Sequence, residues 1–172
     1  MLFRSSLAAA ALLALGACSP TLDWRQVRPE GSPLQALFPC KPKTHARTVA
    51  LAGAQVRMSL YACSTGGHTY ALSLADMGDP AQVTPALRAL REATASNLEA
   101  RNPEVTSLQV PGMTPNTEAA RIRVTGTLPD GQALVQVAGY FAYGTMVYQV
   151  NVVGPQPPDD AVRTFFGGLQ FR

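Results

Sequence analysis

The chain has 172 residues, of which 47% are hydrophobic and 15% are charged. A chain of this length and composition is typical of one globular domain with a substantial buried core. The formal net charge of +3 is too small and too scattered to indicate a protein that binds nucleic acid.

The N-terminus has the features of a bacterial lipoprotein signal. Arg4 provides a positive charge, and the apolar stretch LAAAALLALG that follows is too short to span a bilayer. The sequence LGAC at 15–18 then resembles a lipobox, in which the cysteine thiol receives a diacylglycerol before cleavage. We therefore predict a signal peptide at 1–17, a lipidated Cys18 and a tether at 18–33. A plain secretory signal that ends near a cysteine is the alternative.

The residue after Cys18 bears on where the lipid is held. Retention in the inner membrane of diderm bacteria typically uses Asp at this position, whereas this chain has Ser19. The sorting rule therefore predicts the periplasmic face of the outer membrane. No later run approaches the ~18 apolar residues that a spanning helix needs, so we expect the rest of the chain to lie outside the bilayer.

Alternation of apolar and polar residues predicts three strands in the first half of the domain. Residues 46–53 and 54–63 form a predicted hairpin that turns at Gly53, because glycine readily adopts a positive φ. Residues 68–76 give the third strand.

A long helix is expected next. Thr84 can cap it, with Pro85 at the first helical position, where the missing N–H costs nothing. A start at Asp79 would place Pro85 inside the helix and break a hydrogen bond. The helix is predicted to stop at Asn102, because a residue before proline avoids the α region.

The second half reads as a meander of strands followed by a short helix. The predicted strands are 104–110, 117–127, 132–143 and 145–153. Asp159 and Asp160 suit the N-terminal dipole of the last helix, and residues 169–171 add an edge strand.

The early motif F-P-x-K-P, seen here as FPCKP at 38–42, precedes a hairpin, a long helix, a meander and a terminal helix with an aromatic pair. This order resembles the PsbP-like α-β-α sandwich family of bacterial envelope proteins, over about residues 34–172. The resemblance implies a single α+β domain, with an antiparallel sheet flanked by one long helix and a short C-terminal helix. It also implies a non-catalytic binding or assembly role. Cys40 departs from the family, in which glycine is common inside this turn.

Cys40 and Cys63 remain once the lipobox uses Cys18. Two cysteines in an oxidising compartment favour a disulfide. A hairpin that turns at Gly53 places positions 42–44 opposite Cys63, about one diagonal step from Cys40. We therefore predict a Cys40–Cys63 disulfide.

A metal site is the alternative use of these cysteines. The residues of the types that zinc and copper prefer are Cys40, His45, Cys63 and His68. Each histidine follows its cysteine by five positions. In an extended strand that offset places the two side chains on opposite faces, so neither arm chelates unless the backbone turns at Pro42 or at Gly66-Gly67. We predict no bound metal and no cofactor.

The motifs of common enzyme classes are absent from the sequence, and we predict no catalytic residues. Arg121 and Arg123 share one strand face and could bind an anion, although a solvent-facing polar surface is the simpler interpretation. Core packing is favoured over a ligand platform for the aromatic group of Tyr140, Phe141, Tyr143 and Tyr148.

These observations predict a non-enzymatic, lipid-anchored periplasmic accessory or binding module for a cell-envelope complex. Its expected partners are the membrane, through the N-terminal lipid, and an envelope protein; nucleic acid is not among them. The alternative is a small-molecule or metal-binding lipoprotein that uses the Cys/His hairpin or the tyrosine-rich end of the sheet.

Overall fold

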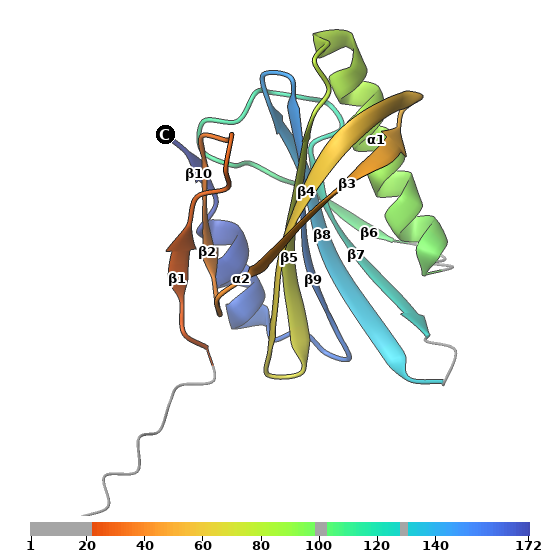
Figure 1. The fold of residues 1–172 in the computed structure, drawn as a ribbon. Helices are drawn as coiled ribbons and strands as arrows, with labels where there is room; N and C mark the ends of the chain where they lie inside the picture. Colours follow the sequence, from red (N-terminus) through yellow and green to blue (C-terminus); the bar gives the residue numbers. More distant parts are fainter. Residues whose placement is uncertain (1–21, 99–102, 128–130) are drawn as a thin grey trace, which may run out of the picture.

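The computed structural model describes residues 22–98, 103–127 and 131–172. Within them the main element is a seven-stranded antiparallel sheet with the order β3-β4-β5-β9-β8-β7-β6 (Figure 1). Its strands are β3 (Lys43–Leu51), β4 (Ala54–Thr65), β5 (His68–Asp76), β6 (Glu104–Ser107), β7 (Ala120–Thr127), β8 (Ala133–Tyr143) and β9 (Met146–Gly154).

A second, three-stranded antiparallel sheet joins the two ends of the described domain. It has the order β1-β2-β10, and its strands are β1 (Arg25–Val27), β2 (Leu34–Phe38) and β10 (Gln170–Phe171). The two helices are α1 (Pro80–Asn97) and α2 (Asp159–Gly167). Figure 1 shows α2 beside the small sheet and α1 on the other side of the large sheet.

The large sheet carries a hydrophobic core on each of its faces. On β8, Val137 and Phe141 belong to the core that contains α2, whereas Ala138 and Tyr140 belong to the core that contains α1. Neighbouring side chains of a strand point to opposite faces, so β8 buries residues on both faces of the large sheet. The small sheet adds Leu34, Ala36 and Phe38 to the α2 core.

The predicted α+β class was wrong. Strands hold 51% of the described residues and helices hold 19%, so the protein is mostly β. Two sheets, and not one sheet between layers of helix, build the domain. The small sheet was not predicted, because its strands pair residues from opposite ends of the chain, such as Gln35 with Gln170.

The predicted hairpins are confirmed by the strand pairing. β3 and β4 are joined by Ala52 and Gly53, with φ angles of 48° and 82°. Positive φ at both central residues is the geometry of a type I′ turn, whose twist matches that of the flanking strands. β8 and β9 likewise meet around Gly144, where Tyr143 pairs with Met146.

The predicted start of α1 was wrong. The helix begins at Pro80, and the side chain of Asp79 accepts a hydrogen bond from the N–H of Ala81 at 2.9 Å. Pro85 therefore lies inside the helix. It is exposed, so the carbonyl that loses its partner can be hydrated, and the extra turn buries Val83 in the α1 core.

The segment predicted as a tether is partly folded. Residues 25–27 form β1, which pairs with β2, and Leu22 and Trp24 pack against the α2 core. The Trp24 ring meets Tyr70 edge-on, with centroids 6.4 Å apart. The described part of residues 18–33 is thus held on the domain. Residues 1–21, which contain the predicted signal peptide and Cys18, lie outside the described residues.

The predicted disulfide is present. Cys40 and Cys63 are bonded, with Cα atoms 6.0 Å apart and a sequence separation of 23. Lys43 pairs with Ala62, and continuing this register by one residue places Pro42 opposite Cys63. The bond therefore ties the connection between β2 and β3 to the end of β4.

We expect reduction of the Cys40–Cys63 bond to lower the free energy of unfolding by about 3 kcal/mol, because the bond restricts the unfolded chain. Urea unfolding with and without reductant measures the difference. The Cys40→Ser/Cys63→Ser variant should match the reduced protein and should not respond to reductant. Two titratable free thiols in the oxidised chain would contradict the assignment.

A buried hydroxyl network joins α1 to the large sheet. Thr94, which is 4% exposed, accepts hydrogen bonds from the Tyr140 hydroxyl at 2.6 Å and from Gln149 Nε2 at 3.1 Å. It donates to the Leu90 carbonyl at 3.2 Å. Burial raises the pKa of Tyr140 to about 12.

This raised pKa gives stability a defined pH dependence. Tyrosine ionises near pH 10 in the unfolded chain, so Tyr140 contributes its full stability below that pH and loses it as the pH rises towards about 12. The loss from this residue should reach about 2–3 kcal/mol. Urea unfolding at a series of alkaline pH values should show a shallower decline for Tyr140→Phe than for the wild type, and equal slopes would be evidence against this role.

Candidate functional site

A cleft on the α2 face of the large sheet brings together three arginines that form no ion pair in the described part of the chain. It has a volume of about 260 Å³. We call it the arginine cleft and define it by the residues that line it: Glu104, Thr106, Arg121, Arg123, Val137, Asp159, Val162 and Arg163.

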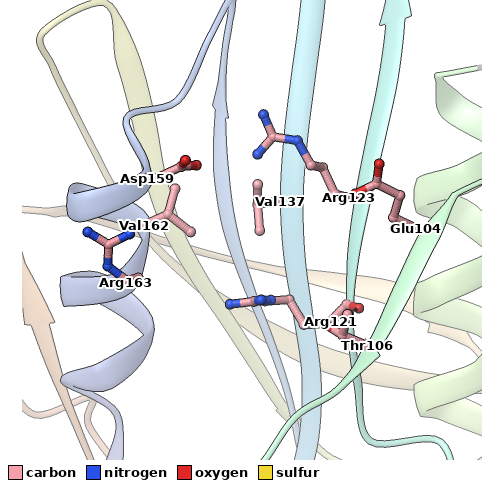
Figure 2. Close-up of a pocket in the computed structure, with 8 residues that line it drawn as sticks. All are labelled: Glu104, Thr106, Arg121, Arg123, Val137, Asp159, Val162 and Arg163. Atoms are coloured by element: carbon pink, nitrogen blue, oxygen red, sulfur yellow. Dashed lines mark hydrogen bonds between the residues drawn. The ribbon is translucent and has the colours of Figure 1, made fainter.

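Strand alternation places two of the arginines. Ile122 and Val124 of β7 are buried in the α1 core, so Arg121 and Arg123 project from the opposite face. Figure 2 shows Arg121 reaching from β7 towards α2, while Arg123 extends from the same strand across β8. Both are half-buried, so this part of the β7 face lies between the exposed surface and the core.

Helix α2 supplies the other wall. Asp159, Val162 and Arg163 lie three and four positions apart, and such positions share one helical face. Val162 and Val137 are 6% and 3% exposed, so the floor between the charged walls is apolar. An ion bound above such a floor is less screened by water than one at an open surface.

A glycine of β8, Gly139, allows α2 to pack closely against the sheet beside the cleft. Gly139 lies opposite Arg121 in the pairing of β7 with β8. The Phe166 ring of α2 packs directly onto Gly139, and the Arg121 guanidinium lies 5.9 Å from the centre of that ring. A cation at this distance from an aromatic face is attracted to it. The absence of a side chain at Gly139 therefore sets the position of Arg121.

The cleft arginines have no carboxylate partner in the described part of the chain, because none of its ion pairs involves them. Glu104 stands opposite Arg123 across β6 and β7 but does not form an ion pair with it. Three guanidinium groups and two carboxylates leave one net positive charge in the cleft. Guanidinium groups bind carboxylate and phosphate in bidentate fashion, so the cleft is suited to an anionic group that bridges β7 and α2.

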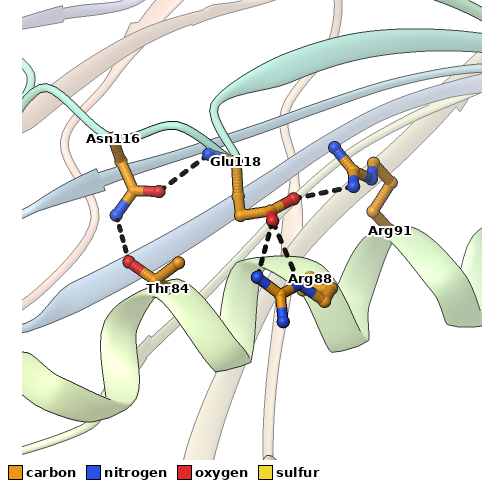
Figure 3. Close-up of polar contacts among 5 residues, drawn as sticks. All are labelled: Thr84, Arg88, Arg91, Asn116 and Glu118. Atoms are coloured by element: carbon orange, nitrogen blue, oxygen red, sulfur yellow. Dashed lines mark hydrogen bonds and ion pairs between the residues drawn. The ribbon is translucent and has the colours of Figure 1, made fainter.

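Two arginines outside the cleft, Arg88 and Arg91, do form ion pairs. Glu118 is held by Arg88 at 3.0 Å and by Arg91 at 2.7 Å, both from α1 (Figure 3). Asn116 accepts from the Glu118 N–H and donates to Thr84 at 2.8 Å. These contacts attach the connection between β6 and β7 to α1. Thr84, predicted as a helix cap, serves this attachment instead.

The four residues of the alternative metal site are not brought together in the structure. The disulfide holds both sulfurs. His45 pairs with Leu60, which points to the face opposite that of Cys63. No group of three or more possible ligands occurs among the described residues.

The second arm has the turn at Gly66-Gly67 that the sequence allowed as an exception to strand parity. Gly66 and Gly67 reverse the chain, so His68 pairs with Thr65 and shares a face with Cys63. The His68 ring packs on Gly154, where an added Cβ would lie 2.3 Å from its Cδ2 atom. His68 is therefore a packing residue at the end of the sheet.

The aromatic group at the end of β8 and β9 is divided between the two faces. Phe141 and Tyr148 stack with centroids 5.1 Å apart in the α2 core, whereas Tyr140 faces α1. Tyr143 is 41% exposed and stacks on Phe171 at 4.7 Å. The group therefore packs the core and the chain terminus and does not form one platform.

Sequence reasoning missed that Arg163, Glu104 and Asp159 line one cleft with the two β7 arginines. Their local patterns indicated a helix face and a strand, but no local signal shows that α2 packs beside β7. Comparison with protein-family models and with curated proteins found no match. The resemblance to the PsbP-like family therefore stays a prediction. In the described segments, no helix is long and apolar enough to cross a bilayer.

The role of Gly139 can be tested by substitution. A Cβ on Gly139 would lie 2.7 Å from Phe166 Cε1, so Gly139→Ala should lower the free energy of unfolding by about 1–3 kcal/mol. Gly167→Ala is the matched control, because nothing lies within 4 Å of a Cβ there, and it should change stability by less than about 1 kcal/mol. Denaturant unfolding measures both variants, and equal effects would contradict this role.

Proposed function

We propose that this protein is a non-enzymatic binding module of the bacterial cell envelope, and that its arginine cleft binds an anionic group of an envelope protein. In this proposal a lipid on Cys18 anchors the chain at the periplasmic face of the outer membrane. The LGAC sequence and Ser19 support the anchor and its location. The observation that carries the binding role is the cleft with its three unpaired arginines.

The surroundings of the cleft favour a protein over a small free anion. β6 forms one edge of the large sheet, and all four of its residues are exposed. Val105 in this strand is 56% exposed, which is unusual among the large hydrophobic residues described. A free strand edge can pair with an extended segment of another chain. Acidic side chains of such a segment would reach Arg121 and Arg123 on the adjacent strand.

A small number of contacts to the cleft arginines can contribute substantially to the affinity for a partner. Hydrogen bonds to charged groups contribute about 1.5–3 kcal/mol each, so two arginines that bind one partner can change its affinity by roughly a hundredfold or more. Glu104 and Asp159 stand at the rim with the opposite charge. They would repel an anion that misses the arginines, which favours one orientation of the partner.

Photocrosslinking from the rim of the cleft tests this function. A photoreactive amino acid replaces the exposed Thr106 in the full chain, in cells that make the protein. We expect a discrete adduct that falls about tenfold or more in the Arg121→Ala/Arg163→Ala background, because two charge-assisted contacts are lost.

Arg47→Ala/Arg57→Ala is the matched control, since both of these arginines are exposed and lie outside the cleft. It should leave the adduct unchanged. An adduct that survives loss of the cleft arginines, or that is lost equally in the control, would show that the cleft does not bind the partner. Folding of each variant is checked by its urea unfolding curve.

A further inference from the structure

The chain enters the domain beside the connection between β2 and β3. The N–H of Asp23 donates to the Pro39 carbonyl at 2.8 Å, and Leu22 packs against the α2 core. Figure 1 shows β1 beginning at the same end of the molecule as this connection. The disulfide ties the connection to β4, so the entry point and the residues next to it are held together.

This end of the domain carries both lysines of the chain. Lys41 lies in the connection and Lys43 begins β3, and both are exposed. They line a hollow of about 320 Å³ next to the disulfide, together with Cys40, Ala62, Cys63 and Ser64. Every other basic residue after the predicted signal is arginine. We call this surface the lysine end and define it by Asp23, Pro39 and residues 40–43.

We propose that the lysine end faces the membrane and contacts anionic lipid headgroups through Lys41 and Lys43. This inference rests on the lipid anchor of the proposed function. Three residues separate Cys18 from Leu22, and the four residue-to-residue steps between them span at most about 14 Å. Electrostatic attraction to a charged bilayer extends over a Debye length of about 8–10 Å. The short link therefore keeps the lysine end within or close to the range of the headgroup charge.

The other charged residues near the lysine end affect how strongly it is attracted to anionic headgroups. Asp23 forms an ion pair with Arg25, so these two cancel. Asp160 is a further acidic group near this end, since its charge adds to the burial that raises the pKa of Tyr70, the strand partner of Cys63. Each lysine near an anionic surface contributes a factor of about five in affinity. Two lysines are too few to recruit a protein, but they can orient one that a lipid already holds.

The rates at which Lys41 and Lys43 react with an amine-specific reagent test the proposed orientation. The mature lipoprotein is purified in detergent, and the lipid on Cys18 is verified by mass spectrometry. It is then reconstituted into vesicles of phosphatidylglycerol or of phosphatidylcholine. An amine-reactive acetylating reagent modifies Lys41 and Lys43, and peptide mass spectrometry gives each rate. We expect phosphatidylglycerol to slow both reactions about fivefold relative to phosphatidylcholine, and high salt to remove the difference.

Arg57→Lys supplies the internal control. Arg57 is exposed and pairs with Thr48, further along the hairpin towards the turn at Gly53. The amine introduced there should react at the same rate on both kinds of vesicle. Equal rates for Lys41 and Lys43 on the two vesicles, with lipid present on Cys18, overturn the orientation and leave the anchor standing. Protection by inorganic phosphate without vesicles also overturns it, in favour of a small-anion site. An unlipidated Cys18 overturns the anchor and this inference together.

Discussion

Burial on both faces of the large sheet is the constraint on which the other features depend. β8 and β9 lie near its centre, and each places apolar side chains in both the α1 core and the α2 core. Each face therefore needs a cover that excludes water. α1 covers one face, and α2 with the three-stranded sheet covers the other. The N-terminal and C-terminal strands are brought together because β2 and β10 complete this second cover.

The arginine cleft lies where the second cover ends. Val137 and Val162 still meet under it, whereas Arg121 and Arg123 occupy the next inward-facing positions on β7. A half-buried arginine covers apolar surface with its stem and keeps its charge at the margin. The same residue type is used differently on α1, where Arg88 and Arg91 both form ion pairs with Glu118. On α1 the ion pairs with Glu118 attach the connection between β6 and β7. In the arginine cleft the guanidinium groups form no ion pair and are available to a ligand.

Local patterns predicted the parts of the fold that depend on local geometry. The β3–β4 hairpin followed from alternation and from Gly53, and its register brought Cys63 close to Cys40. The start of α1 was wrong because a local rule about Pro85 was outweighed by the burial of Val83. Strand parity does not apply to the His68 arm, because the two-glycine turn reverses the chain between Cys63 and His68.

The amino-acid sequence by itself determined the strands of the large sheet, their hairpin turns, the two arginines on one face of β7 and the cysteine pair that could meet. These depend on a period of two, on positive φ at glycine and on short loops, which are properties of neighbouring residues. Only the tertiary structure decided that residues 25–27 and 34–38 are strands, that a second sheet closes the α2 core, and that Arg163 stands across from Arg121. These depend on which covers bury the two faces of the large sheet, and that choice is made by residues far apart in the chain.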